Sequence, residues 1–255
     1  MDTVLRINEL LAKGETFCLA TVISSADRQI APGLKVIIHP DGLREGGTGQ
    51  DETDKLLSDL ALQVLSEQKK KLIEVGKSLT VFFDIMSAKA RIVICGAGHI
   101  AIPLARYAKE VGFAVTVLDD RPDFASPDRF PGCEVIADDF VRALGRIPTA
   151  RSTFVVIITR GHEHDVECLT EIIKHETAYI GLIGSRRRVG FVLEMLAEQG
   201  IAKERLADIF TPIGVPIGAE SPEEIALSIT AELVCVRRKG MGQAKALSNA
   251  VRGSA

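Results

Sequence analysis

The chain has 255 residues, of which 46% are hydrophobic and 25% charged, and its formal net charge is −3. This length accommodates two domains of about 100–150 residues, and this composition is typical of globular proteins, which excludes disordered, collagen-like and coiled-coil chains. Because the net charge is negative and only 5% of the residues are aromatic, a nucleic-acid-binding surface is not expected.

The first 88 residues carry the helix and strand patterns of a small α+β domain. Apolar spacing and β-branched runs predict, in chain order, a helix at 4–11, strands at 17–23 and 34–39, a glycine-rich loop at 42–52, a helix at 54–73 and a strand at 79–85. Residues 86–89 are predicted to be a linker to the next domain.

From residue 89 to residue 240 strands and helices alternate strictly. The pattern predicts strands at 91–95, 114–119, 154–159 and 179–183, and helices at 100–111, 164–175 and 187–199. Nearly continuous apolar strands that alternate with helices are typical of a parallel sheet covered on both faces. We therefore predict an α/β fold, with a Rossmann-like doubly wound domain after the smaller one. Residues 241–255 are predicted to be a flexible basic tail.

A glycine-rich segment, Gly96-Ala-Gly-His-Ile-Ala101, lies between the first strand and the first helix of this second domain. Gly96 permits a tight turn, and Gly98 lets the backbone approach a pyrophosphate closely. The N–H groups at the start of the following helix favour an anion. His99 faces the predicted phosphate region, either as a polar helix-start residue or as a group that takes part in chemistry.

An acidic pair, Asp119 and Asp120, ends the next predicted strand. Asp119 lies 21 residues after Gly98, where an acid of a Rossmann domain binds the ribose 2′-hydroxyl of a dinucleotide. The two carboxylates repel a 2′-phosphate, so NAD is favoured over NADP, although Arg121 could offset that repulsion.

His162 and Asp165 follow the third strand and are spaced to share one helix face. This spacing predicts a ligand-facing histidine that the carboxylate holds in one tautomer. Two alternatives are a metal pair of His162 with His164, and solvated histidines beside Asp165 as a helix-start acid.

Gly184, Ser185 and Arg186 open the helix after the fourth strand, and two more arginines follow. A glycine, a hydroxyl and guanidinium groups at a helix N-terminus suit a phosphate. Further along, Gly214 lies in a loop that we expect to line the ligand cleft, because its glycines suggest close approach of backbone to a ligand.

Five long segments together resemble the XdhC/CoxI family, accessory factors for molybdenum hydroxylases such as xanthine dehydrogenase. The segments are Gly96–Ala101, Val117–Ala125 with Arg129–Pro131, Thr159–Asp165, Tyr179–Arg188 and Thr211–Ala226, and the resemblance extends over residues 91–237. The family also has a smaller N-terminal domain. There the sequence departs from the family pattern: Ser24-Ser-Ala-Asp-Arg28 replaces Gly-Ser-x-Pro-Arg, and the turn Glu45-Gly-Gly-Thr-Gly49 has no cysteine.

The resemblance implies an accessory or chaperone protein that binds the molybdenum cofactor, molybdopterin, and aids its sulfuration or insertion. Its implied partners are a molybdenum hydroxylase such as xanthine dehydrogenase, a cysteine desulfurase and a second copy of the chain. The residues show no convincing nucleophile–base pair, so a cofactor carrier is favoured over a turnover enzyme. The alternative is an NAD-dependent oxidoreductase, with His162 or His99 as acid/base, or an NAD-sensing regulatory protein.

The five cysteines, Cys18, Cys95, Cys133, Cys168 and Cys235, form no C-x-x-C pair and suit a reducing compartment. We expect none of them to be a metal ligand. The sequence shows neither a signal-peptide pattern nor an apolar run of membrane-spanning length, which predicts a cytoplasmic protein.

Overall fold

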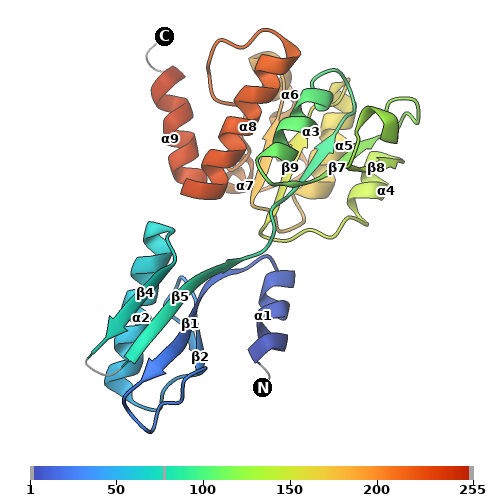
Figure 1. Ribbon diagram of the computed structural model, residues 1–255. Coiled ribbons are helices and arrows are strands. Elements are labelled where there is room, and N and C mark those ends of the chain that lie inside the picture. Colours follow the sequence, from blue (N-terminus) through green and yellow to red (C-terminus); the bar gives the residue numbers. More distant parts are fainter. Residues whose placement is uncertain (1–2, 77–78, 253–255) are drawn as a thin grey trace. The chain divides into compact units, whose positions relative to one another are not determined.

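The computed structural model describes residues 3–76 and 79–252, which fold into two compact units, Met1–Ala88 and Lys89–Ala255. Each unit has its own five-stranded sheet and its own hydrophobic core (Figure 1). The units are described separately below.

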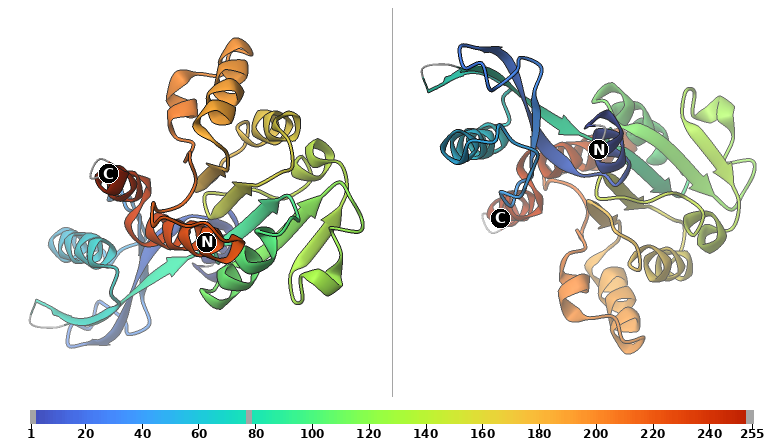
Figure 2. Two further views of the ribbon diagram at one scale, coloured as in Figure 1. Left: turned by 90° about the horizontal axis from the view of Figure 1, so that it is seen from above. Right: turned by 90° about the horizontal axis from the view of Figure 1, so that it is seen from below.

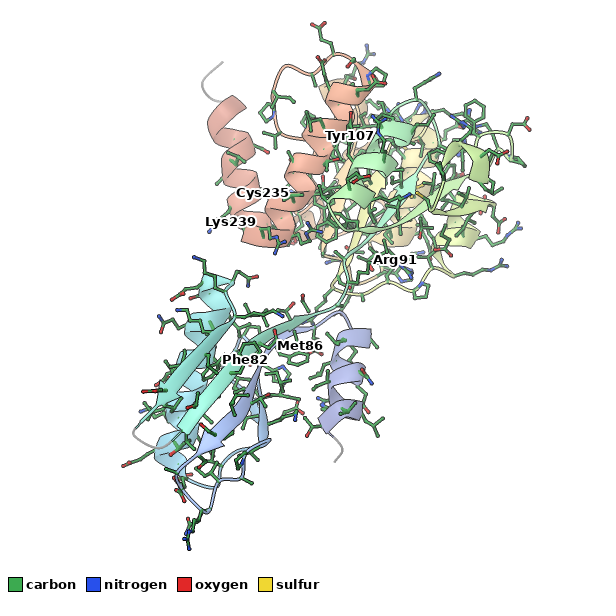
Figure 3. All side chains as sticks on the ribbon, in the orientation of Figure 1. Phe82, Met86, Arg91, Tyr107, Cys235 and Lys239 are labelled. Atoms are coloured by element: carbon green, nitrogen blue, oxygen red, sulfur yellow. The ribbon has the colours of Figure 1, made fainter. Side chains whose placement is uncertain are left out.

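The first unit is an antiparallel sheet with one helix on each face. Its elements are α1 (Thr3–Ala12), β1 (Thr16–Ser25), β2 (Lys35–Ile38), β3 (Arg44–Glu45), α2 (Asp51–Glu67), β4 (Lys71–Val75) and β5 (Leu79–Ser87), with strand order β3-β2-β1-β5-β4. Alternation along β1 explains the two faces: Cys18 and Ala20 pack in the core that includes α2, whereas Phe17 and Leu19 pack against α1. Figure 3 shows Phe82 and Met86 along β5, and Met86 packs on the α1 side.

Two expectations for this unit are wrong. The predicted helix at 54–73 ends at Glu67, because Gln68 adopts a left-handed conformation with φ of 54°. The chain then returns as strand β4, on which Leu72 is 62% exposed. The predicted linker at 86–89 begins inside β5, which continues to Ser87 and pairs there with Thr16.

The second unit has a wholly parallel sheet, which confirms the predicted α/β fold. Its strands are β6 (Arg91–Cys95), β7 (Ala114–Asp119), β8 (Glu134–Ala137), β9 (Thr153–Ile157) and β10 (Tyr179–Leu182), in the order β10-β9-β6-β7-β8. Its helices of eight or more residues are α3 (Ala101–Glu110), α5 (His162–Ile172), α6 (Arg186–Glu198), α8 (Pro222–Lys239) and α9 (Met241–Arg252). This strand order places the central β6 between β7 and β9, as in a dinucleotide-binding half of a Rossmann fold.

Helices cover both faces of the parallel sheet (Figure 2). Ile92 and Ile94 of β6 pack on the side of α3 and α8, while Val93 and Cys95 pack on the side of α5 and α6. Tyr107 of α3 and Cys235 of α8 both join the first of these cores (Figure 3). The apolar strands are thus buried on both faces, as the sequence pattern predicts.

The C-terminal segment is not the flexible tail that its basic composition suggests. Residues 241–252 form α9, which contacts α8 and buries Ala244 to 1% exposure. Three short elements are not predicted by the sequence pattern: β8, α4 (Phe140–Leu144) and α7 (Lys203–Ala207). Across residues 3–76 and 79–252, no helix combines the length and the apolar character needed to cross a lipid bilayer.

Candidate functional site

The glycine-rich turn lies at the carboxyl edge of the parallel sheet, directly after β6. Gly96 has a φ of +108°, and a Cβ added there would lie 2.5 Å from the carbonyl oxygen of Ile158. At Gly98 an added Cβ would meet no atom of the described residues within 4 Å. The fold itself therefore requires glycine at position 96 but not at position 98, where the need for glycine would come from a bound ligand.

Three successive amides at this turn are available to an anion. The N–H groups of Gly98, His99 and Ile100 donate to no acceptor within residues 3–76 and 79–252, and α3 begins immediately afterwards at Ala101. Unpaired N–H groups at a helix start, with the positive end of the helix dipole, favour a phosphate or carboxylate. His99 is exposed at the same place.

Asp119 is buried and holds the turn rather than facing solvent. Its Oδ2 accepts a hydrogen bond of 2.7 Å from the Ala97 amide, and its two oxygens accept from Nε and Nη2 of Arg121 at 2.8 and 3.0 Å. Arg121 also lies 3.6 Å from the centre of the Phe124 ring. The acid predicted to bind a ribose is therefore engaged within the protein, and the hydrogen bonds to Asp119 raise the pKa of Arg121.

A second pair connects the ends of β7 and β9. Both carboxylate oxygens of Asp120 accept from the Arg160 guanidinium, at 2.5 and 2.7 Å. This hydrogen-bonded pairing lowers the pKa of Asp120 to about 2. Because the pair is partly exposed, solvent screens it, and its contribution to stability is modest.

His162 and Asp165 do not form the predicted pair. Asp165 is fully buried; its Oδ1 accepts from the Thr159 hydroxyl at 2.6 Å and its Oδ2 from Nε of Arg188 at 2.7 Å. Burial raises the pKa of Asp165, although both hydrogen bonds oppose that effect. The exposed His162 ring instead packs edge-on against Phe191, with ring centroids 5.5 Å apart.

The start of α6 is a capped helix terminus at the end of β10. Ser185 is the N-cap, and its hydroxyl accepts from the Arg188 amide at 3.3 Å. Gly184 lies just before it, and the side chain of Arg186 is outside the described part of the chain. The Arg188 side chain turns towards Asp165, so it serves the buried network and not the predicted phosphate site.

Gly214 has a structural role that differs from the predicted one. It is buried with φ of +91°, and a Cβ there would lie 2.5 Å from the Ser228 hydroxyl of α8. Its amide donates to Glu232, also on α8, at 3.0 Å. The close approach that the glycine permits is thus to a helix of the same unit.

In the first unit, the two segments that depart from the family pattern lie together. The side-chain amide of Gln50, the residue directly after the 45–49 turn, donates to Asp27 of the 24–28 segment at 2.8 Å. Thr48, in the turn that has no cysteine, donates through its backbone amide and its hydroxyl to Asp54, at 2.7 and 2.8 Å. The turn is therefore held by a buried carboxylate.

The cysteines have the features of thiols in apolar surroundings. Cys18, Cys95 and Cys168 are buried, and burial raises the pKa of Cys18 to about 12. Burial also raises the pKa of the half-buried Cys133, against a smaller opposing effect of Lys109. Within the described residues, no three His, Cys, Asp or Glu side chains are grouped to hold a metal ion, so His162 and His164 lack a third such ligand.

Three residues of this edge, Arg160, Arg188 and Phe191, have roles that the sequence pattern does not predict. Arg160 lies inside the segment Thr159–Asp165, where the pattern assigns roles only to the histidine and the carboxylate. Arg188 is predicted with its neighbours to bind phosphate, and Phe191 has the apolar character of a core residue. Arg160 precedes His162 by two residues, whereas Arg188 and Phe191 reach the same region through the pairing of β9 and β10.

Comparisons with known proteins agree with this architecture. Residues 92–233 match the family model of the XdhC Rossmann domain, and residues 10–76 match that of the XdhC and CoxI family. The uncharacterized protein YqeB of Escherichia coli K12 is 29% identical over 242 residues, which are 89% of this chain and 44% of that protein. A probable xanthine dehydrogenase subunit of Bacillus subtilis 168 is 30% identical over 164 residues, 64% of this chain and 48% of that one.

A solved structure is also similar. The crystal structure of a xanthine dehydrogenase from Bacillus halodurans superposes with a TM-score of 0.64 at 25% identity, covering 92% of this chain and 66% of that one. The chain therefore spans about half the length of the two curated relatives and about two thirds of the solved chain.

Proposed function

The chain belongs to the XdhC and CoxI family, and from that membership we propose that it is an accessory protein of molybdenum hydroxylases that carries their phosphorylated pterin cofactor. The observation that supports this most directly is the turn at residues 98–100. Its three unpaired amides and its uncrowded glycine suit a phosphate group, whatever the rest of the ligand is.

The residues of the turn fit the phosphate of molybdopterin. The amides of Gly98, His99 and Ile100 would hold it, and the bond from Ala97 to Asp119 fixes the turn in position beforehand. His99 is exposed beside these amides and would contact the same group. When bound, the cofactor would supply the molybdenum centre that the partner enzyme uses.

The proposal extends to how the cofactor is delivered. One relative is named as a probable component of a xanthine dehydrogenase, and we take a xanthine-dehydrogenase-like hydroxylase as the acceptor of the cofactor. Because the turn that holds Thr48 has no cysteine and the Thr48 hydroxyl is bound to Asp54, we assign sulfur donation to a separate cysteine desulfurase. The chain would then protect and present the cofactor, as a monomer or as a homodimer.

The experiment measures how much ligand the 255-residue chain retains during gel filtration. The chain is incubated with molybdopterin and, separately, with NADH, and bound ligand is measured in the protein peak. We expect molybdopterin to be retained by the native protein and lost in Gly98→Asp, which places a side chain and a negative charge at the anion position. Gly242→Asp is the control, since an added Cβ at this exposed α9 glycine also meets no described atom within 4 Å.

The outcomes separate the candidate functions. Retention of NADH but not of molybdopterin would favour the NAD-dependent alternative and contradict our proposal. That alternative is disfavoured by Asp119, whose oxygens already accept hydrogen bonds from Ala97 and Arg121. If the Gly98→Asp variant retains as much molybdopterin as the native protein, the binding site is not at the turn.

A further inference from the structure

An exposed aromatic pair lies at the carboxyl edge of the parallel sheet. Phe191 on α6 is 48% exposed. Its ring meets the His162 ring edge-on, at 5.5 Å between centroids and an interplanar angle of 85°. The buried residues on the inner side of the same helix are Val189, Val192 and Leu196. Phe191 is therefore not part of the hydrophobic core that anchors α6.

Large aromatic side chains are costly to expose, and an edge-to-face pair leaves part of its surface free. Burying a phenylalanine side chain is favourable relative to leaving it exposed. The contact with His162 covers only a part of the Phe191 ring, since nearly half of the residue remains accessible. A third planar ring can stack on the remaining face, which is the arrangement that aromatic groups favour.

The position of the pair relative to the anion turn follows from the strand order. His162 begins the helix after β9, which is adjacent to β6, and Phe191 is in the helix after β10, the next strand. At the end of β7, on the other side of β6, the two acids are already paired: Asp119 with Arg121, and Asp120 with Arg160, which follows β9. A ligand anchored by phosphate at Gly98 thus finds aromatic surface towards β10 and occupied ion pairs towards β7.

We propose that Phe191, supported by His162, is the stacking platform for the planar heterocycle of the ligand whose phosphate is held at residues 98–100. The ligand class is a phosphorylated, fused nitrogen heterocycle such as a pterin. This inference rests on the proposed function for the phosphate site and adds to it the residue that recognises the ring. Phe191 is a specificity residue here, and His162 is a positioning residue that fixes the Phe191 ring.

Two probes separate ring recognition from phosphate recognition. Binding to the full-length chain is measured by isothermal titration calorimetry, with 6-hydroxymethylpterin diphosphate as the complete probe and inorganic pyrophosphate as the probe without a ring. Phe191→Ala is expected to lower the affinity for the pterin probe about 10-fold or more, which is the effect typical of losing a base–aromatic stacking contact. The affinity for pyrophosphate should not change.

Three further variants complete the test. Phe191→Tyr retains the aromatic face and should bind the pterin probe within about two-fold of the native protein, since stacking depends on the ring. Leu227→Ala, at an exposed leucine of α8, should have no effect. Gly98→Asp should abolish binding of both probes.

The outcomes are distinct. If Phe191→Ala binds the pterin probe as tightly as the native protein does, the proposed stacking role of Phe191 is wrong, whereas the proposed phosphate site is not contradicted. If the native protein binds neither probe, or if Gly98→Asp binds both normally, the proposed phosphate site itself is wrong. Circular dichroism of each variant verifies that it is folded.

Discussion

Two buried carboxylates of the parallel-sheet unit, Asp119 and Asp165, show how polar residues are used at the edge of the sheet. Each accepts hydrogen bonds from a nearby backbone or hydroxyl donor and from an arginine. A buried carboxylate without such donors would be strongly unfavourable. Both acids therefore hold the loops of the site in place, whereas the groups available to a ligand are backbone amides and an aromatic ring.

Alanine at position 96 should destabilise the second unit, and alanine at position 98 should not. Gly96→Ala introduces a methyl group 2.5 Å from the Ile158 carbonyl oxygen at a φ of +108°, so we expect a loss of at least about 1–3 kcal/mol in the free energy of unfolding. For Gly98→Ala the change should stay within about 1 kcal/mol. Urea denaturation followed by circular dichroism measures both, and equal losses would contradict the assignment of Gly98 to ligand approach.

Asp165→Asn should destabilise the same unit, because it leaves the Arg188 guanidinium beside a neutral partner. Removing one member of a buried ion pair costs roughly 3–5 kcal/mol, and we expect the lower end because the Arg188 side chain is 28% exposed. Asp208→Asn, at an exposed acid 3.7 Å from Lys245, should change stability by less than about 0.5 kcal/mol. A similar small effect at position 165 would show that the buried network is not important for stability.

The residues of the anion turn could be predicted from sequence, whereas their long-range partners could not. The segment Gly96–Ala101 is recognisable because a tight turn, a strand before it and a helix after it are all local properties. The Asp120–Arg160 pair is formed by residues 40 positions apart. Its existence depends on β7 and β9 both lying next to β6, and a single sequence does not reveal that order.

At the scale of elements, an ion-pair cluster links α1 to the β2–β3 hairpin of the first unit. Nε and Nη2 of Arg6 donate to Glu45 at 2.8 and 2.9 Å, and His39 lies 2.9 Å from the same carboxylate. The Arg6 hydrogen bonds, with a lesser contribution from His39, lower the pKa of Glu45 to about 2, although burial opposes this effect. A carboxylate with a lowered folded-state pKa stabilises the fold above its unfolded pKa and loses that contribution in acid.

The stability of the first unit should therefore fall between about pH 4.5 and pH 2 in a manner that depends on Glu45. Glu45→Gln should lower the melting temperature at pH 6 and reduce the acid dependence, so that native and variant proteins converge near pH 2. Glu74→Gln, at an exposed acid of β4, should retain the native profile. Differential scanning calorimetry across this range provides the measurement, and parallel profiles for native protein and Glu45→Gln would contradict the role of the cluster.

Helix α9 should be necessary for the stability of the second unit. Ala244→Glu places a charge where the native side chain is 1% exposed, and we expect a loss of about 2–4 kcal/mol from burial of an unpaired carboxylate or undocking of the helix. Ala246→Glu is the matched control on the exposed side of the same helix. Equal melting temperatures for the two variants would contradict the role of α9 and favour the flexible tail that the sequence predicts.

Physical reasons explain why the sequence patterns did not predict some of the elements. The helix pattern of residues 54–73 spans two elements because Leu72, an exposed strand residue, continues the leucine spacing of α2. The basic composition of the C-terminal segment concealed the buried positions among the described side chains of α9, Ala244 and Ser248. Small residues such as these contribute little to an apolar pattern, although they allow α8 and α9 to pack closely.

At the scale of the whole molecule, the two units are expected to unfold separately, because among the described residues no strand belongs to both sheets. Phe83→Ala removes a fully buried ring of the first core and should cost that unit about 3–5 kcal/mol. Hydrogen exchange followed by mass spectrometry should then show faster exchange in residues 3–76 and unchanged protection in β6, β7 and β9. Faster exchange in both units would show that they fold as one.

The hydrogen bond from the Ala97 amide to Asp119 has a kinetic consequence. The turn is tied to the end of β7 by the fold itself, so the loop has little conformational entropy to lose when an anion arrives. Binding to a preorganised site does not wait for a rearrangement, and it avoids the slow association typical of sites that must first order themselves. A protein with such a turn would capture an anionic ligand at the rate of encounter, and the lifetime of the complex would then be set by how fast the ligand leaves.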